Sequence, residues 1–480
     1  MKYLFVFSVF LLFIPNTLIS QFNNQETKVI EELDSKADDY FKIAKEIWTY
    51  AEVGYQEYKS SELLQMTLKN EGFQIETGVA EIPTAFVASY GQGSPIIGIL
   101  GEFDALPGIT QTAAPSREER TDVDAGHACG HHLFGAGSAA AATAVKNWMT
   151  DNGISGTVRF YGTPAEEGGA GKAYMVRGGL FDDVDAVLHW HPANRNAADA
   201  ASSLANKSAK FRFYGLSAHA SAAPHQGRSA LDGVEAMNHM VNMMREHMTM
   251  ESRTHYVITK GGEAPNVIPD FAEVFYYVRH PDMAIAASNF ERIVKCAEGA
   301  AIGTDTRMEY EIIHGIYNVL PNVTLSQIMH DNLVRVGGVK YNEEEKAFAK
   351  MIISSLEYGD NISLQIAENI GPFKVIRKGQ GGSTDVGDVS WAVPTAGLRT
   401  ATYVPGTPSH SWQAIASGGT TIGQKGMINA AKTMALTAMH LFQNEDVLKK
   451  AKAELDDQRG SDFVYKPLFG DRKPPLDYRN

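Results

Sequence analysis

Residues 95–108, "PIIGILGEFDALPG", change from an apolar run to acidic side chains and then to a proline and a glycine. The apolar run predicts a buried strand, and the polar part predicts the loop that follows it. The same change occurs in residues 156–169, "GTVRFYGTPAEEGG", and in residues 184–192, "VDAVLHWHP". Because sites in open α/β sheets form at the carboxyl ends of strands, these stretches predict a parallel sheet with polar side chains along one edge.

Helical segments alternate with these strands. Residues 29–73 have helical spacing, with Gly72 as a C-terminal stop. Residues 135–149, "GAGSAAAATAVKNWM", predict a helix whose small side chains let another element approach closely. The alternation returns from residue 321 and ends in an amphipathic helix near 424–443, followed by a surface helix and an irregular, proline-rich end. The predicted fold class is α/β, with a mixed, mostly parallel sheet.

Residues 207–318 have a different pattern, in which strands alternate between apolar and polar residues. Their order is strand, helix, two strands, helix and strand, which predicts a smaller α+β domain of ferredoxin-like type inserted into the larger one. The expected organisation is a signal peptide at 1–20, a larger domain in two parts at 21–206 and 319–480, and the inserted domain at 207–318.

Composition and charge restrict the classes of partner. The chain has 480 residues, of which 44% are hydrophobic and 21% charged, so it can bury a sizeable core. A net charge of -13 disfavours nucleic acid and anionic membranes as partners, because both repel an acidic surface. With two cysteines, Cys129 and Cys296, the chain cannot build a disulfide framework beyond one bridge.

The first twenty residues, "MKYLFVFSVFLLFIPNTLIS", have a basic start, a short apolar run and a proline. The run is shorter than the roughly 20 residues that span a bilayer, and its proportions predict a secretory signal peptide with cleavage after Ser20. We therefore expect an exported, periplasmic protein. The alternative interpretation is a buried N-terminal strand or helix.

Residues 124–142, "DAGHACGHHLFGAGSAAAA", place Cys129 and His131 two positions apart, just before the predicted helix. A thiolate and an imidazole together suit zinc or a similar transition metal. No paired CxxC units are present, so a catalytic metal site is favoured over a structural one. The alternative is an inert buried thiol beside hydrogen-bonded core histidines. Further candidate ligands lie near the ends of predicted strands: Glu102, Asp104, Glu166, Glu167, His189, His191 and, much later, His410.

These motifs together resemble the M20 family of metallopeptidases, in its amidohydrolase branch (subfamily D), and within that branch the aminobenzoyl-glutamate hydrolases, in their B-type chain. The resemblance rests on the ordered motifs "GEFDALPG", "HACGHH", "TPAEEGGAGK", "HWHP", "GLSAHASAAPHQGRSALDGVEAMN", "NVIPD", "GGSTDVGDVSW" and "GTPSHSWQ". It extends from about residue 35 to the C-terminus.

The resemblance implies a centre of two divalent metal ions, with zinc expected and manganese or cobalt as alternatives. The ligands it implies are Cys129, His131, Glu167, His191 and His410. Glu166 resembles the general base, and Asp104 resembles the residue that orients a metal ligand. Glu102 stands where many relatives have histidine, and His132 where the branch has Asp or Asn, so the roles of both are left open.

For the inserted domain, the resemblance implies a lid that also supports dimerisation. His219 would stabilise the oxyanion, commonly in the active site of the partner subunit. Asn266 and Arg279 would hold the carboxylate of the substrate, which a planar guanidinium can bind in bidentate fashion. A surface salt bridge is the alternative role for Arg279.

The function expected from the sequence is a metal-dependent amidohydrolase that cleaves an N-acyl or N-aroyl amino acid of the aminobenzoyl-glutamate kind, with Glu166 as base and then acid. The expected partners are a small amide substrate with a carboxylate, a second copy of the chain in a homodimer, and a related second subunit. Two alternatives are a dipeptidase of the same family and a non-catalytic binding protein. A serine amidase is disfavoured, because the chain has no GxSxG.

Overall fold

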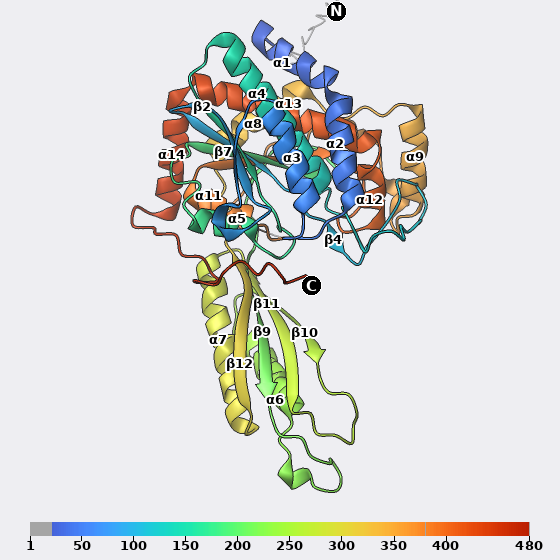
Figure 1. The fold of residues 1–480 in the computed structure, drawn as a ribbon, viewed down its shortest axis with the longest axis vertical. Coiled ribbons are helices and arrows are strands. Elements are labelled where there is room, and N and C mark those ends of the chain that lie inside the picture. The colour runs from blue at the N-terminus through green and yellow to red at the C-terminus, as the bar shows by residue number, and fades with distance from the viewer. Residues whose placement is uncertain (1–21, 380, 480) are drawn as a thin grey trace, which may run out of the picture.

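The computed structural model describes residues 22–379 and 381–479. The predicted signal peptide, residues 1–20, lies outside the described residues. Figure 1 shows a broad, layered larger part and a narrow smaller part that projects from one end of it. Among the described residues, no helix is long and apolar enough to cross a membrane.

The core of the larger part is a six-stranded sheet. Its spatial order is β1 (Gln74–Thr77), β2 (Phe86–Gln92), β6 (Gly156–Gly162), β3 (Ile96–Gly101), β7 (Ala186–Ala193) and β14 (Thr395–Ala401). β6, β3, β7 and β14 pair in parallel, whereas β2 is antiparallel to both β1 and β6. The prediction of a mixed, mostly parallel sheet is confirmed. The carboxyl ends of β6, β3 and β7 consequently lie side by side.

Helix α4 (His131–Asn152) packs against β3, β6 and β7 and against α13 (Thr421–Gln443). Its small residues permit this approach: a Cβ on Gly137 would lie 2.8 Å from the Met427 side chain of α13. The remaining helices of the larger part include α5 (Gly171–Arg177), α8 (Val323–Val336), α9 (Glu343–Ser354), α10 (Gln365–Glu368), α11 (Val386–Ala392), α12 (Trp412–Gly418) and α14 (Glu445–Arg459). The helix predicted near 424–443 is therefore present as α13.

The helical spacing predicted over 29–73 corresponds to three helices. These are α1 (Asn24–Ser35), α2 (Ala37–Tyr50) and α3 (Tyr58–Asn70). α2 ends because Ala51 adopts a left-handed conformation, with φ of 48°, and the chain reverses before α3. Helical spacing in the sequence persists across such a turn, so it did not reveal the break.

The smaller part is an antiparallel sheet in the order β10 (Arg253–Lys260), β11 (Phe271–His280), β9 (Ala205–Tyr214) and β12 (Arg307–Ile316). Two helices, α6 (Ala230–Arg245) and α7 (Met283–Gly303), pack on it around a core that includes Phe211 and Tyr276. The chain order β-α-β-β-α-β is the ferredoxin-like arrangement that the pattern predicted.

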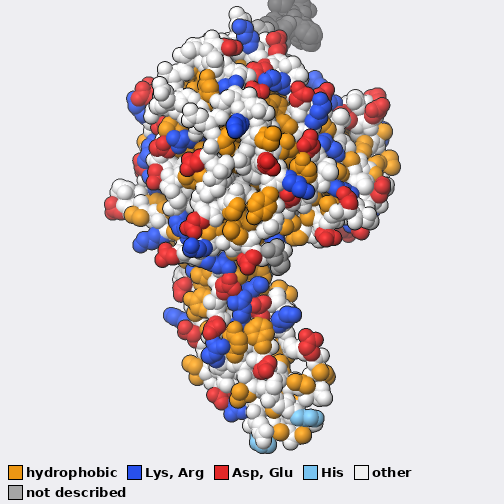
Figure 2. Space-filling model, in the orientation of Figure 1, with side chains coloured by type: hydrophobic (Ala, Val, Ile, Leu, Met, Phe, Trp, Pro, Cys, Tyr) orange, Lys and Arg blue, Asp and Glu red, His pale blue; other side chains and the backbone are white. Residues whose placement is uncertain are grey.

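The chain after α14 does not trail into solvent. In Figure 1 this dark red segment crosses the junction between the two parts of the molecule. The Phe469 ring stacks on that of Tyr174 with centroids 4.2 Å apart, and Pro474 and Pro475 are buried. Figure 2 shows Lys and Arg side chains gathered around the same junction. The irregular, proline-rich end that the sequence predicted is thus packed against both parts of the molecule.

Candidate metal centre and active site

A cleft of about 1020 Å³ opens at the carboxyl edge of β3, β6 and β7. Its walls include Glu102 after β3, Glu166 and Glu167 after β6, and His191 in β7. Cys129 joins them from the turn before α4. The parallel arrangement of the three strands therefore brings together side chains that are far apart in the sequence.

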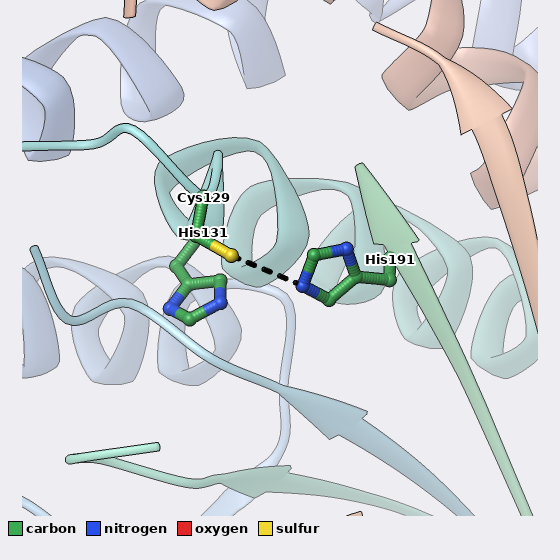
Figure 3. A group of neighbouring side chains, drawn as sticks. All are labelled: Cys129, His131 and His191. Atoms are coloured by element: carbon green, nitrogen blue, oxygen red, sulfur yellow. Dashed lines mark hydrogen bonds between the residues drawn. The ribbon is translucent and has the colours of Figure 1, made fainter. Parts of the chain in front are cut away.

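Gly130 makes it possible for Cys129 and His131 to face the same point. Its φ is +76°, and a Cβ there would lie 2.6 Å from the Tyr403 hydroxyl and 2.7 Å from Pro192. Only glycine fits this turn without a clash. The Cys129 Sγ then lies 3.4 Å from His191 Nε2, and Figure 3 shows the His131 ring beside this pair.

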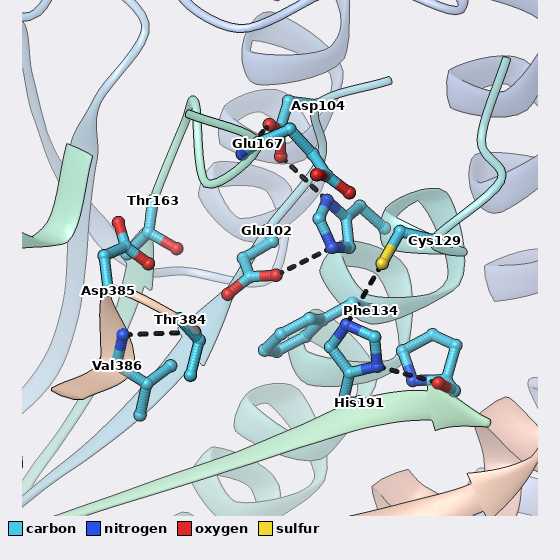
Figure 4. A network of polar contacts seen from close by, with 12 residues as sticks. Glu102, Asp104, Cys129, Phe134, Thr163, Glu167, His191, Thr384, Asp385 and Val386 are labelled. Atoms are coloured by element: carbon cyan, nitrogen blue, oxygen red, sulfur yellow. Dashed lines mark hydrogen bonds and ion pairs between the residues drawn. The ribbon is translucent and has the colours of Figure 1, made fainter. Parts of the chain in front are cut away.

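His131 is held by Asp104. Its Nδ1 lies 2.8 Å from Asp104 Oδ1, while Asp104 Oδ2 accepts the backbone N–H of Glu167 at 2.9 Å. Burial would raise the pKa of Asp104, but the neighbouring His131 and the Glu167 amide outweigh it and hold this pKa below its usual value. Asp104 therefore sets the orientation of His131 and the position of Glu167 together. Figure 4 shows Asp104 beside Glu167.

The ring of His191 is arranged to offer Nε2 to a metal. Its Nδ1 lies 2.7 Å from the Pro192 carbonyl oxygen, which assigns the proton to Nδ1 and leaves a lone pair on Nε2. Burial, together with the nearby positive charge of His131, holds the pKa of His191 well below its usual value. A neutral imidazole with one nitrogen fixed by a backbone carbonyl is the usual state of a metal ligand.

Glu167 and His410 complete one side of the cluster. His410 Nε2 lies 3.4 Å from Glu167 Oε1, and the His410 backbone N–H donates to the carbonyl of Ala128 at 3.0 Å. His410 has a φ of 60°, a left-handed conformation that is uncommon outside glycine and that concentrates at functional sites. That hydrogen bond ties His410 to the residue before Cys129.

The donor atoms fit a divalent transition metal. In the described part of the chain, Glu102 Oε2, His131 Nε2 and Glu167 Oε1 are buried without a hydrogen-bond partner, although His131 Nε2 lies only 3.0 Å from Glu102 Oε2. Buried carboxylate oxygens and an imidazole nitrogen without hydrogen-bond partners suit a bound cation. Three sets of donors each lie within 4.8 Å of one another: Cys129, His131 and His191; Cys129, Glu167 and His410; Glu102, His131 and Glu166. Sulfur, nitrogen and carboxylate donors together suit zinc and related metals.

The surroundings of Cys129 and His131 raise the pKa values of both side chains. Burial raises the pKa of the Cys129 thiol, and Glu167 adds to this effect. Burial also opposes the charge on His131, yet Glu102, Cys129 and Asp104 outweigh it and hold the pKa of His131 well above its usual value. The carboxylates around Cys129 and His131 thus raise both pKa values, as expected for a site that suits a cation.

Glu166 lies beside this cluster on a constrained loop. Burial raises the pKa of Glu166 well above its usual value, and the carboxylates of Glu102 and Glu167 add to the effect. The preceding residue, Ala165, has a φ of 59° and donates its N–H to the buried Glu57 at 2.8 Å. A carboxyl with a raised pKa, fixed next to a metal site, is suited to general base and acid chemistry.

A buried ammonium behind the cleft was missed by the sequence analysis. Lys172 is fully buried, and its Nζ lies 2.7 Å from Glu102 Oε1 and 2.6 Å from Asp385 Oδ1. Its backbone N–H also donates to Asp385. The one local indication of this buried ion pair was a lysine in a largely apolar helix. Glu102 thus joins Lys172 to the donor cluster, because its second carboxylate oxygen faces His131.

Two predicted candidates near the motif lie outside the metal cluster. His132 is buried and its Nε2 lies 3.1 Å from the Gly418 carbonyl oxygen. Because it follows His131 on α4, its side chain leaves the helix about 100° away from that of His131. His189 lines the cleft, and burial lowers its pKa to about 3, but it belongs to none of the three donor sets.

The candidates of the smaller part are divided between its two ends. Arg279, near the end of β11, lines the cleft. His219 and Asn266 are not among the described residues that line it; the His219–Ala220 turn pairs with Asn266 and Val267 in loops beyond the opposite end of that sheet. β11 has ten residues and spans roughly 30 Å, so the expectation that Asn266 and Arg279 share one site does not hold within a single chain.

The two cysteines are both free. The cleft also contains Arg195, Arg399 and Arg479, for which no motif gave a signal.

Comparisons with known proteins agree with this arrangement. The peptidase family M20/M25/M40 matches residues 98–414. The chain is 41% identical to the B-type chain of the p-aminobenzoyl-glutamate hydrolase of Escherichia coli, over 88% of this chain and 93% of that protein. It is 28% identical to the Xaa-Arg dipeptidase of Mus musculus over 90% and 93% of the two chains.

A solved structure shares the fold. It is that of a dinuclear metal-binding peptidase of the M20 family from Bacillus subtilis, with a TM-score of 0.58 and 18% identity over 86% of this chain and 99% of that chain. The chain therefore belongs to peptidase family M20/M25/M40 and is a hydrolase of amide bonds.

Proposed function

We propose that the chain cleaves the amide bond between an acyl or aroyl group and an amino acid, with p-aminobenzoyl-glutamate as the first substrate to test. The observation that carries this proposal is the position of Glu166, a carboxyl of raised pKa, beside the metal-donor cluster in a cleft that also holds Arg279. The name of the Escherichia coli relative supports the choice of substrate.

Metal binding, proton transfer and binding of the substrate carboxylate are assigned to different residues. Divalent metal held by Cys129, His131, Glu167, His191 and His410 would supply Lewis acidity to water and to the scissile carbonyl. Glu166 takes the proton of the attacking water and delivers it to the departing amine, so one carboxyl acts as base and then as acid. Arg279, whose Nε is buried without a partner in the described part of the chain, receives the substrate carboxylate.

The proposal includes two divalent ions, with zinc first and manganese or cobalt as alternatives. Its support is the pair of donor sets Cys129–His131–His191 and Cys129–Glu167–His410, which share only Cys129 and together contain all five proposed ligands. The Bacillus subtilis structure of this fold is that of a dinuclear metal-binding peptidase. Metal analysis of the purified protein checks the stoichiometry, and one ion per chain at full activity would contradict it.

We also propose a homodimer in which the partner subunit's His219 completes each active site. His219 lies in the loop after Tyr214, at the end of the smaller sheet opposite to Arg279, and it is not among the described residues that line its own cleft. A related second subunit is the alternative, since the name of the Escherichia coli relative describes one subunit of a hydrolase. Size-exclusion chromatography with light scattering tests this, and a monomer that is fully active would contradict both arrangements.

Export to the periplasm stays part of the proposal, supported by the sequence of residues 1–20. N-terminal sequencing of the protein from a periplasmic fraction is expected to begin at Gln21. Recovery of the chain from the cytoplasm with Met1 intact would contradict it.

The decisive experiment is amide hydrolysis by the mature protein with and without zinc, cobalt or manganese. The substrates are p-aminobenzoyl-glutamate, several acyl-amino acids and several dipeptides, because the mouse relative is a dipeptidase. Turnover that metal restores and that Glu166→Ala abolishes at unchanged metal content supports the proposal. Preferred cleavage of dipeptides would favour the dipeptidase. Metal binding without turnover on any substrate would favour a binding protein.

A further inference from the structure

The segment that follows α14 reaches the active-site cleft, where Arg479 is one of the lining residues. Residues 460–479 leave the larger part, cross the junction and return to the loop that carries the two glutamates. Tyr478 donates its hydroxyl to the Glu167 carbonyl at 3.2 Å, and a guanidinium N–H of Arg479 donates to the same oxygen. Arg479 therefore stands directly beside a candidate metal ligand.

Several contacts along its length hold this segment in place. The Arg472 guanidinium forms an ion pair with Glu311 of β12 and donates to the Ile313 carbonyl at 2.7 Å. The Leu476 carbonyl accepts from the Gln56 side chain at 2.8 Å. The Tyr478 ring packs edge-on against Tyr55, with centroids 5.6 Å apart. Contacts with both parts of the molecule therefore fix the position of Arg479.

Arg479 and Arg279 line the same cleft, although they come from different parts of the molecule. Both line the cleft, and both act electrostatically on the same two side chains, Tyr277 and His314. The Arg279 guanidinium lies 5.3 Å from the centre of the Tyr277 ring. Two positive charges thus line one cleft, and one of them, on Arg479, lies beside Glu167.

Neither guanidinium has an acidic partner. In residues 22–379 and 381–479, no carboxylate lies within ion-pair distance of Arg279 or Arg479, and the Ser383 hydroxyl is a weak partner of Arg279 at 3.5 Å. By contrast, Arg159 and Arg335 each pair with a carboxylate at under 3 Å. Two convergent cations without counter-ions form a receptor for two negative charges.

We propose that Arg479 is a specificity-determining residue that binds the side-chain carboxylate of a glutamyl or aspartyl leaving group, while Arg279 binds its α-carboxylate. This inference rests on the proposed amide hydrolysis and deepens it. The segment 460–479 thereby selects dicarboxylic amides over amides of neutral amino acids.

The test compares two substrates that differ in one charge, N-benzoyl-glutamate and N-benzoyl-glutamine. Arg479→Gln is expected to lower kcat/KM for the glutamate substrate about 10- to 100-fold, mostly through KM, because a charge-assisted hydrogen bond is lost. The glutamine substrate should keep a rate close to the wild-type value. Arg479→Lys should recover part of the preference, since it restores the charge without the planar guanidinium.

Lys473→Gln is the matched control. It removes the same charge from the same segment, but Lys473 is 81% exposed and pairs with Glu81 outside the cleft. An equal loss in Lys473→Gln and Arg479→Gln would show a general charge effect and overturn the inference. An equal loss on both substrates in Arg479→Gln would assign the residue a purely structural role and also overturn it.

Binding separates this inference from the proposed function. Calorimetry on the metal-loaded Glu166→Gln variant, with and without Arg479→Gln, measures the affinity for the same two compounds. If the wild-type protein hydrolyses neither compound but binds the glutamate compound more tightly through Arg479, the proposed function fails and the inference stands. If both compounds are hydrolysed equally well, the proposed function stands and the inference fails. If neither is bound, both fail.

Discussion

The Nδ1 atom of His131 lies 2.8 Å from Oδ1 of Asp104, and the other oxygen of that carboxylate accepts the Glu167 amide. One buried side chain therefore positions two candidate metal ligands at once. Loss of the Asp104 carboxylate should therefore weaken metal binding more than it weakens the fold.

Asp104→Asn is accordingly expected to lower the affinity for zinc about 10- to 100-fold, the usual effect of losing the partner that orients a ligand. The amide keeps the size of the side chain but cannot offer two anionic acceptors. Titration against a competing chelator measures the affinity, and circular dichroism confirms that the fold is retained. An unchanged affinity would show that His131 does not need Asp104.

Lys172→Met should destabilise the protein strongly. It leaves Glu102 and Asp385 buried without their common ammonium partner, and breaking a buried ion pair in this way costs about 3–5 kcal/mol. Urea unfolding of the metal-free protein, followed by intrinsic fluorescence, measures the loss. Lys146→Met, which removes an ion pair with Glu71 at 3.6 Å nearer the surface, is the control and should change stability much less. Equal losses would contradict the role given to the network.

Asp388, which belongs to none of the three donor sets, gives the stability of the fold a pH dependence. It accepts the Tyr465 hydroxyl at 2.7 Å and the Tyr317 N–H at 3.0 Å, and burial raises its pKa to about 7. A carboxyl whose folded pKa lies above its unfolded value, about 3.9, stabilises the fold fully below that value and loses this contribution as pH rises towards 7. The free energy of unfolding should therefore fall by up to roughly 4 kcal/mol between pH 4 and pH 7 from this group.

Asp388→Asn removes that titration while keeping one acceptor oxygen. Relative to the wild-type protein, the variant should gain stability steadily from pH 4 to pH 8. Urea unfolding at each pH gives the difference. A difference that does not change with pH would contradict the raised pKa.

The position of His219 predicts complementation between inactive variants. If His219 serves the cleft of the partner subunit, His219→Ala and Glu166→Ala are each inactive, but a mixed dimer contains one complete site. Refolding an equal mixture should restore about a quarter of the wild-type activity, since half of the dimers are mixed and each has one of its two sites intact. No recovery in a mixture shown to exchange subunits would place His219 outside the partner's site.

Local features of the sequence determined much of this protein. Apolar runs followed by Glu102, Glu166 and His191 predicted parallel strands with polar carboxyl ends. This prediction was possible because a buried strand and the polar residues at its end are adjacent in the sequence. The spacing of Cys129 and His131 predicted a metal site, because a thiol and an imidazole two positions apart can face the same point. The ferredoxin-like order of the smaller part followed from alternation and helical spacing alone.

Only the tertiary structure decided which distant groups meet. Lys172 and Asp385 are 213 residues apart, and nothing near either residue shows that they share a buried ion pair. Arg479 reaches Glu167 across 312 positions through a segment with no regular pattern. His132 and His219 lie in motifs as His131 and His410 do, yet the turn of α4 and the length of the smaller part keep them out of the donor sets of their own chain. Such contacts depend on how whole elements pack, which periodicity within one element does not specify.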